Sequence, residues 1–309
     1  IQMLARLAWD RSRAMLIDLL DPRQPQAVQE AAILALATDR DPQIAREFLA
    51  RSESLAPKAR AALVQSLLAR PEWTLLLLTA GDKPRDLLTL LDSSRRESLL
   101  RHADARIAQA ASALLGSNGN GGSSSSSSGA AAAAARGEVV RRYAAALERA
   151  GDPARGKLVF ERECSSCHKI GDLGHAVGPD LASSPSRDPA ALLTNILDPN
   201  QYVQPNYLVY VLALTDGRVA EGMIAGDTPT SLTLKRSGGE QESLLRGAIE
   251  SMKSSGRSLM PEGLEAKIPP AQMADLLAFL MVSGGADPSA SPRAKLGIGT
   301  LPGLIEPDK

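Results

Sequence analysis

Residues 164–181 read CSSCHKIGDLGHAVGPDL and contain both cysteines of the 309-residue chain and two of its three histidines. Within this stretch, Cys164, Cys167 and His168 form a Cys-x-x-Cys-His pattern. Such a cluster occurs in structural zinc sites, in redox-active disulfides and in covalent haem attachment. The residues around the cluster decide among these three chemistries.

A structural zinc site needs four ligands, which usually come as two pairs. The chain has no second Cys/His pair, and His175 alone would not complete the set. A thioredoxin-like pair is expected near a βαβ unit, whereas these cysteines follow a predicted helix and precede a glycine-rich loop. Haem attachment gives each residue a role, because the cysteines would form thioethers with the haem vinyl groups and His168 would bind the iron. We therefore predict one covalent c-type haem, with zinc or a plain disulfide as the alternatives.

The sequence on both sides of the motif predicts three helices. Asp152 and Pro153 form a helix start, with a capping carboxylate followed by a first-turn proline, and this helix would run directly into Cys164. A second helix is predicted over 188–197. Leucines at helical spacing after two prolines predict a closing helix over 269–282.

Two strand pairs are predicted between the second helix and the closing helix. Residues 207–225 are rich in β-branched and aromatic side chains, and Asp216-Gly217 between the two runs is a strong hairpin signal. The segments SLTLKR and ESLLRG repeat this pattern more weakly around an SGGE turn. We expect a small antiparallel β insertion over about 207–250.

The N-terminal part of the chain is helical in pattern throughout. The stretch VQEAAILALA (28–37) is echoed by ARAALVQSLLA (59–69) and again by ARIAQAASALLG (105–116). This spacing predicts stacked HEAT-like helical repeats over residues 1–116, with an irregular helical bundle as the alternative.

Three further segments complete the predicted domain organisation. Residues 117–136 are rich in Gly, Ser and Ala and are predicted to form a flexible linker, whose alanines favour helix. Residues 137–284 would then form the second domain, and 285–309 a C-terminal tail. A flexible linker would let the second domain move between an electron donor and an acceptor.

Over residues 151–284 the sequence resembles the class I cytochrome c family. Gly156 and Phe160 stand where such domains pack the first helix against the last, and Phe279 and Leu280 offer the partner surface. The resemblance implies a mainly α fold around one haem c.

The resemblance also assigns a role to the segment GHAVGPDL, which follows the attachment motif. In the family, the carbonyl of the proline that matches Pro179 accepts a hydrogen bond from the histidine that binds the iron. This bond fixes the tautomer and the orientation of that histidine, here His168.

The second axial ligand implied by the resemblance is a methionine in a loop before the last helix. SLMPEGLE (258–265) matches that loop and nominates Met260. Met252 and Met223 are weaker alternatives. His175 is the rival from bis-histidine chemistry, but it follows His168 too closely in the chain to reach the opposite haem face easily.

The long interval between His168 and Met260 departs from the ordinary class I pattern, because much of it is the predicted β-rich segment. The order of repeats, CSSCHKIG, VGPDL, ILDPN, TDGRV and SLMPEGL resembles the haem-binding domain at the C-terminus of large planctomycete-type proteins. In that family, a dehydrogenase-like propeller often precedes HEAT-like repeats. The resemblance implies electron transfer from a dehydrogenase domain or subunit to a respiratory acceptor.

A haem iron with both axial positions filled by protein has no vacancy for oxygen or peroxide, so we expect an electron-transfer module rather than a catalyst on its own. If Met260 is displaceable, the alternative is a haem-based peroxidase or a gas or redox sensor. A third interpretation is a helical-repeat interaction scaffold with an accessory haem. We expect a periplasmic or otherwise extracytoplasmic location, because the thioether-forming machinery works outside the cytoplasmic membrane.

Composition excludes two kinds of partner. The 35 basic and 35 acidic residues balance, and no basic stripe indicates nucleic-acid binding. The longest apolar stretches, such as LLLLTA at 75–80, fall well short of the roughly 20 residues that a membrane-spanning helix needs. We therefore expect no nucleic-acid site and no membrane span in this chain.

Overall fold

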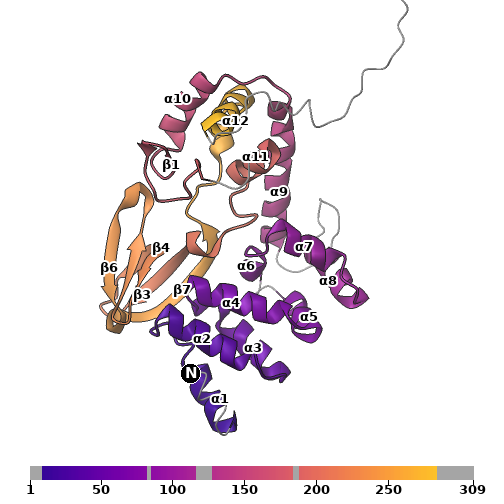
Figure 1. Ribbon diagram of the computed structural model, residues 1–309, viewed down its shortest axis with the longest axis vertical. Coiled ribbons are helices and arrows are strands. Elements are labelled where there is room, and N and C mark those ends of the chain that lie inside the picture. Colours follow the sequence, from indigo (N-terminus) through magenta and orange to yellow (C-terminus); the bar gives the residue numbers. More distant parts are fainter. Residues whose placement is uncertain (1–8, 82–84, 116–126, 184–187, 284–309) are drawn as a thin grey trace, which may run out of the picture.

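The computed structural model describes residues 9–81, 85–115, 127–183 and 188–283. Figure 1 shows two groups of elements, one with helices α1 to α8 beside a β-sheet and the other with helices α9 to α12. The N-terminal helices are α1 (Trp9–Asp18), α2 (Gln26–Leu36), α3 (Pro42–Arg51), α4 (Pro57–Leu68), α5 (Pro71–Thr79), α6 (Arg85–Leu88), α7 (Ser93–Leu100) and α8 (Ala105–Leu115).

The N-terminal helices form an array in which the early members are paired regularly. Helix α2 packs on α4 and α3 packs on α5, as two stacked helical pairs would, and the echoed stretches 28–37 and 59–69 fall largely in α2 and α4. The later members depart from this order, because α6 has only 4 residues and α8 packs on α5 and α7. The helical character of this region is confirmed, whereas HEAT-like repeats are not.

The β-sheet has five antiparallel strands in the order β6-β5-β4-β3-β7. Both expected strand pairs are confirmed, with a turn at Asp216-Gly217 in which Gly217 has a φ of 84°. The expectation of a small insertion is wrong, because a fifth strand continues well past residue 250. The strands are β3 (Leu208–Leu214), β4 (Val219–Asp227), β5 (Ser231–Lys235), β6 (Gln241–Leu245) and β7 (Ile249–Ser258).

Strand β7 has a weak strand pattern because of what its inner face contacts. Met252, Ser254 and Gly256 are its buried positions beyond the first residue. Gly256 has a φ of 67°, and a Cβ placed on it would lie 2.7 Å from the Cβ of Asp86 in α6. Such a close approach selects small residues, which have low strand propensity. After its first residue, the sequence of β7 therefore lacks the branched apolar residues by which a strand is usually predicted.

The sheet and the N-terminal helices share one hydrophobic core, here called the scaffold core. Tyr210 of β3 is fully buried in it, and its hydroxyl donates a hydrogen bond to the carbonyl of Leu55 at 3.0 Å. The scaffold core joins side chains from helices α1 to α8 and from all five strands of the sheet, among them Leu36, Phe48, Leu63, Trp73, Tyr210, Leu212, Leu232, Leu234 and Met252.

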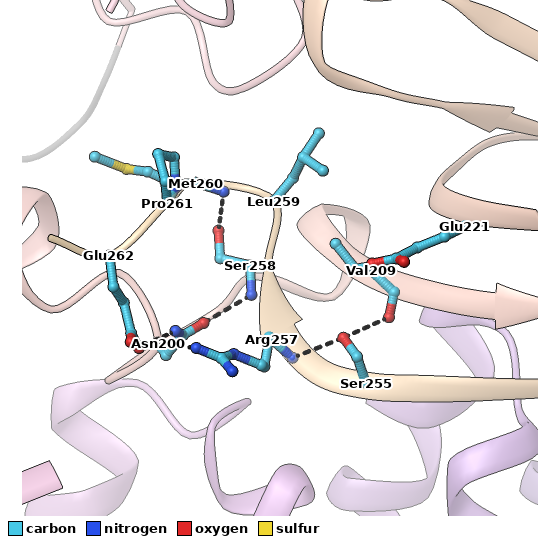
Figure 2. A pocket seen from close by; sticks show the side chains of 10 residues that line it. All are labelled: Asn200, Val209, Glu221, Ser255, Arg257, Ser258, Leu259, Met260, Pro261 and Glu262. Carbon is cyan, nitrogen blue, oxygen red and sulfur yellow. Dashed lines mark hydrogen bonds and ion pairs between the residues drawn. The ribbon is translucent and has the colours of Figure 1, made fainter. Parts of the chain in front are cut away.

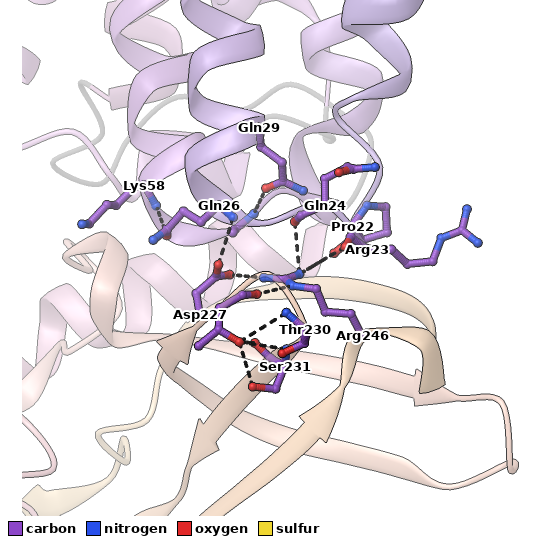
Figure 3. Close-up of polar contacts among 12 residues, drawn as sticks. Pro22, Arg23, Gln24, Gln26, Gln29, Lys58, Asp227, Thr230, Ser231 and Arg246 are labelled. Atoms are coloured by element: carbon purple, nitrogen blue, oxygen red, sulfur yellow. Dashed lines mark hydrogen bonds and ion pairs between the residues drawn. The ribbon is translucent and has the colours of Figure 1, made fainter. Parts of the chain in front are cut away.

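A buried ion pair fixes the sheet to the loop between α1 and α2 (Figure 3). Arg246 is 5% exposed, forms an ion pair with Asp227 at 2.6 Å and donates to the carbonyls of Thr228 and Gln24 at 2.8 and 3.1 Å. The other carboxylate oxygen of Asp227 accepts from the backbone N–H of Gln26 at 3.1 Å. Because both charges are buried and hydrogen-bonded, this contact specifies where the sheet sits on the helices.

Helix α9 (Ser127–Tyr143) occupies the second half of the predicted linker. Its Arg136 donates to Glu265, and the hydroxyl of Tyr143 donates to the carbonyls of Glu265 and Ile268 at 2.9 and 3.0 Å. Residues 127–136 of the predicted linker are therefore helical, and Arg136 at their end is held by Glu265. The rest of the predicted linker and the predicted tail lie outside the described residues.

Helices α10 (Pro153–Glu163), α11 (Pro189–Leu197) and α12 (Pro270–Ser283) enclose a second cluster, here called the C-terminal core. The predicted start of α10 is confirmed, because Asp152 accepts from the backbone N–H groups of Ala154 and Arg155. The C-terminal core includes Tyr143, Phe160, Leu193, Leu197, Ile268, Met273, Leu276 and Phe279.

Helices α10 and α12 approach closely at a glycine. A Cβ on Gly156 would lie 2.0 Å from the carbonyl oxygen of Asp275, so no larger residue fits this crossing. The rings of Phe160 and Phe279 meet next to it, with centroids 5.6 Å apart. The predicted packing of the first helix on the last is confirmed. Among the described helices, none is both long and apolar enough to cross a membrane.

Candidate functional site

The cysteine motif is one extra turn added to the end of α10. Ser165 bonds back to the carbonyl of Phe160 at 2.9 Å, while Cys167 and His168 bond to the carbonyl of Cys164 at 3.1 and 2.9 Å. These bonds hold the two thiols and the imidazole on a tight turn at the margin of the C-terminal core. Cys164, Cys167 and His168 are each half-buried, and both thiols are free.

The segment after the motif folds back over it. Strands β1 (Lys169–Ile170) and β2 (Leu173–Gly174) form a short hairpin, and the chain then runs past the motif. Val177 and Gly178 both donate to the carbonyl of Cys167, at 3.0 and 2.7 Å. Gly174 has a φ of 79°, and a Cβ there would lie 2.2 Å from the carbonyl oxygen of His168. Glycine is therefore required for the loop to cover the turn this closely.

The orientation of His168 is set by the same segment. Its Nδ1 lies 2.9 Å from the carbonyl oxygen of Pro179, so the predicted hydrogen bond is confirmed. Because a carbonyl can only accept, Nδ1 carries the proton and Nε2 of the neutral ring keeps its lone pair. A Cβ on Gly178 would lie 2.7 Å from Cε1 of the ring, so the imidazole is confined on that side.

Burial shifts the pKa values of the motif in the direction expected for neutral groups. Burial lowers the pKa of His168, and the bond to Pro179 opposes this shift. Burial raises the pKa of the Cys164 thiol to about 12, with smaller contributions from Glu163 and Cys167. A redox-active cysteine pair needs the opposite shift, because the thiolate is the reacting form.

The zinc alternative finds no support in the part of the chain that the structure describes. No group of three or more His, Cys, Asp or Glu side chains is placed there to hold a metal ion. His175, the remaining histidine of the opening stretch, is exposed, and its backbone N–H bonds to the carbonyl of Ser165 at 2.9 Å. The neutral, tautomer-fixed His168 beside two free thiols fits haem attachment better than either alternative.

Met260 lies in the loop that follows β7 (Figure 2). Its backbone N–H donates to the hydroxyl of Ser258 at 3.1 Å, and Gly263, with a φ of 88°, turns the chain towards α12. The Met260 side chain is half-buried and packs against the C-terminal core, as does Cys164. The Met260 side chain and the start of the cysteine motif therefore meet the same cluster of apolar residues.

The rival methionines lie elsewhere. Met252 is buried in the scaffold core, on the face of β7 that contacts the helices. Met223 is buried within β4, where it pairs with Val209 of β3. Neither side chain packs against the C-terminal core that Cys164 and Met260 contact. The assignment of Met260 as the second ligand stays a prediction, and its position favours it over both rivals.

A group of polar residues that the sequence pattern did not single out surrounds the Met260 loop. It includes Asn200, Arg257, Ser258 and Glu262, which line a pocket of about 280 Å³ together with Met260. The sheet also contacts the segment that follows the cysteine motif, because the ammonium group of Lys235 at the end of β5 donates to the carbonyl of Ala176 at 3.0 Å. The ILDPN segment was the available signal for Asn200, but its partners are far away in the sequence.

Comparisons with known proteins agree with this geometry. The family model for cytochrome c matches residues 153–207, which include α10, the cysteine motif, the Pro179 segment and α11. No curated protein matches the chain. The chain therefore contains a cytochrome c domain, a type of domain that binds haem, and the matched segment ends before the sheet and before Met260.

Proposed function

We propose that the cytochrome c domain of this chain transfers electrons through a single c-type haem with His168 and Met260 as axial ligands. The observation that carries this proposal is the hydrogen bond between His168 and Pro179 beside the two free cysteines. When bound, the haem supplies an iron that takes up and releases one electron. The residues around it determine how the haem is held and which chemistry it is allowed.

Cys164 and Cys167 would hold the haem through two thioether bonds. Their place on a turn that continues α10 gives both sulfurs a fixed position relative to the imidazole of His168. The proton on Nδ1 of His168 stays on the Pro179 side, so the lone pair of Nε2 is directed away from that carbonyl. The chain thus offers a ligand that needs no proton release before it binds iron.

Met260 would fill the sixth position and exclude small ligands from the iron. Its support is the match of SLMPEGLE to the family loop, its half-buried side chain and its contact with the C-terminal core. A thioether ligand also favours the ferrous state and raises the reduction potential. A haem ligated on both sides by protein changes its structure little when its charge changes, which suits electron transfer.

The partners and the location belong to the same proposal. The resemblance to planctomycete-type haem domains supports a dehydrogenase as donor, a respiratory acceptor and an extracytoplasmic location. The N-terminal helices would support the haem domain. The sheet, which lies between His168 and Met260 in the sequence, packs on these helices through the scaffold core. This arrangement favours a fixed haem domain over one that moves on a linker.

A redox titration of the holoprotein, made together with haem-maturation machinery, tests the proposal. We expect one reversible one-electron transition, no binding of carbon monoxide to the ferrous protein within seconds of mixing, and no peroxide turnover above that of free haem. Rapid carbon monoxide binding or sustained peroxide turnover would instead support the sensor or peroxidase alternative.

A further inference from the structure

One side chain holds both ends of the Met260 loop. The amide oxygen of Asn200 accepts from the backbone N–H of Ser258 at 2.8 Å, and its amide nitrogen donates to the carboxylate of Glu262 (Figure 2). Ser258 precedes Met260 by two positions and Glu262 follows it by two. We propose that Asn200 is a positioning residue that keeps the thioether of Met260 in place as a haem ligand. This inference rests on the proposed function, because it requires Met260 to be the sixth ligand.

The partners of Asn200 are themselves anchored. Ser258 is the last residue of β7 and pairs with Leu208 of β3, so its backbone belongs to the sheet. The second carboxylate oxygen of Glu262 forms an ion pair with Arg257 at 3.2 Å. Asn200 therefore connects a fixed strand end to a carboxylate that is held from two sides. The short loop between these points has little freedom to move Met260.

Asparagine is suited to this position by its chemistry. The Ser258 N–H needs an acceptor and the Glu262 carboxylate needs a donor, and the amide of Asn200 supplies one of each. An aspartate would offer two acceptors and place a second negative charge against Glu262. Alanine would offer neither group and would leave both partners without these bonds.

Asn200 belongs to a segment that is bound to the N-terminal helices. Arg96 of α7 donates to the carbonyl of Gln201, and its guanidinium also reaches the carbonyls of Leu88 and Leu91 at 3.1 and 2.8 Å. Burial lowers the pKa of Arg96, with Asp198 opposing the shift. Since Arg96 contacts the residue next to Asn200, the position of Met260 depends on helices that lie far from it in the sequence.

The same segment has a second bond to the helical array. The backbone N–H of Val203 donates to the carbonyl of Thr89 at 2.9 Å, just after α6. Thus residues 198–203 contact the helices on one side and the Met260 loop on the other. A change on the helical side is expected to act on the haem through this segment.

Loss of the Asn200 bonds should raise the fraction of molecules in which Met260 is detached. One buried or half-buried hydrogen bond corresponds to about a tenfold change in such an equilibrium. For Asn200→Ala we expect carbon monoxide to bind the ferrous protein about tenfold faster. We also expect a weaker near-infrared charge-transfer band in the ferric protein and a lower reduction potential.

The experiment compares four holoproteins: the unaltered protein, Asn200→Ala, Arg96→Ala and the control Asn195→Ala. Asn195 is an exposed asparagine in α11, five positions before Asn200, and its replacement should leave all three readouts unchanged. Arg96→Ala should shift them in the same direction as Asn200→Ala, by a smaller factor. Thermal unfolding measured in parallel distinguishes a loss of Met260 positioning from general destabilisation. General destabilisation would lower the melting temperature without a change in the band, the potential or the carbon monoxide rate.

Asn200→Ala with the band, potential and carbon monoxide rate of the unaltered protein would overturn the inference. If Met260→Ala abolishes the band while Asn200→Ala leaves it intact, only the positioning role fails. If the unaltered protein lacks the band, the Met260 ligation that the inference rests on fails as well. These two failures are therefore distinguishable in one set of spectra.

Discussion

The scaffold core and the C-terminal core differ in how their edges are closed to solvent. The scaffold core is filled by its own large side chains, with Phe48 and Trp73 edge to face at 6.0 Å and Arg70 stacked over Trp73 at 4.6 Å. The C-terminal core is closed where α10 crosses α12, but Cys164 and Met260 remain half-buried at its margin. The comparison shows one region built for stability and another that keeps its reactive groups accessible at an edge.

This difference predicts that substitutions at the margin of the C-terminal core abolish the haem and spare the scaffold. Replacing Cys164 and Cys167 together with Ala should remove all covalently bound haem, because no other thiol exists in the chain. Haem staining of a denaturing gel measures this, and circular dichroism should still show the N-terminal helices. Ser166→Ala in the same turn is the control and should keep the stain. A stained band in the double variant would mean that the haem is not held by these cysteines.

A loss of stability without a change at the haem is expected when the buried ion pair that fixes the sheet to the helices is broken. Arg246→Ala leaves the Asp227 carboxylate buried without its partner, which should lower the free energy of unfolding by about 3–5 kcal/mol. Denaturant titration measures this loss, and the ferric spectrum of the folded fraction should be unchanged.

Arg218→Ala is the matched control for that experiment, because Arg218 pairs with Asp216 on the surface of the sheet. Exposed ion pairs contribute little, so its unfolding curve should nearly coincide with that of the unaltered protein. Equal losses in both variants would show that the Arg246 contact does not specify the docking of the sheet.

A smaller loss in the free energy of unfolding is expected from a substitution where α10 crosses α12. Gly156→Ala places a methyl group 2.0 Å from the Asp275 carbonyl oxygen, so the two helices must separate. Overpacking of this kind typically costs about 1–3 kcal/mol, and it should lower the temperature at which the haem absorbance changes. Gly247→Ala is the control, since a Cβ there meets nothing within 4 Å. An unchanged transition in Gly156→Ala would show that the crossing is not tight.

The smallest effect concerns pH and the start of α10. Arg155 lowers the pKa of the buried Asp275 carboxyl below its usual 3.8, because it donates two hydrogen bonds to it. The folded protein thus binds this proton less readily than the unfolded chain does. The stabilisation that the ionised Asp275 carboxylate contributes is fully present above pH 3.8. It is lost as the pH falls through the lowered pKa of Asp275 in the folded protein. Unfolding curves between pH 3 and 7 should show a shallower acid loss in Asp275→Asn, and identical slopes would contradict this.

The local parts of the haem domain could be predicted from the sequence, because their signals are short-range. The Asp152-Pro153 start and the adjacent cysteine motif each depend on a few neighbouring positions. The crossing of α10 and α12 at Gly156 joins distant positions, and its prediction came with the family resemblance. The hydrogen bond of His168 to Pro179 follows from the same short segment and came with the family resemblance.

The long-range parts could not be predicted in this way. Strand β7 escapes a pattern search because the close approach of α6 places Ser254 and Gly256 where strands usually carry branched apolar residues. The docking of the sheet on the helices depends on pairs such as Tyr210 with Leu55, whose residues have no distinctive local pattern. The role of Asn200 likewise depends on its hydrogen bonds to Ser258 and Glu262, which are far from it in the sequence.

The near-infrared absorption of the ferric holoprotein, measured beside Met260→Ala, tests the central claim most directly. We expect a weak charge-transfer band in the unaltered protein and its complete loss in Met260→Ala, with a lower reduction potential and new binding of carbon monoxide to the ferrous variant. Met273→Leu, which replaces a methionine fully buried in the C-terminal core, should keep the band. Persistence of the band in Met260→Ala, or its absence from the unaltered protein, would contradict the assignment of a closed His168/Met260 electron-transfer site.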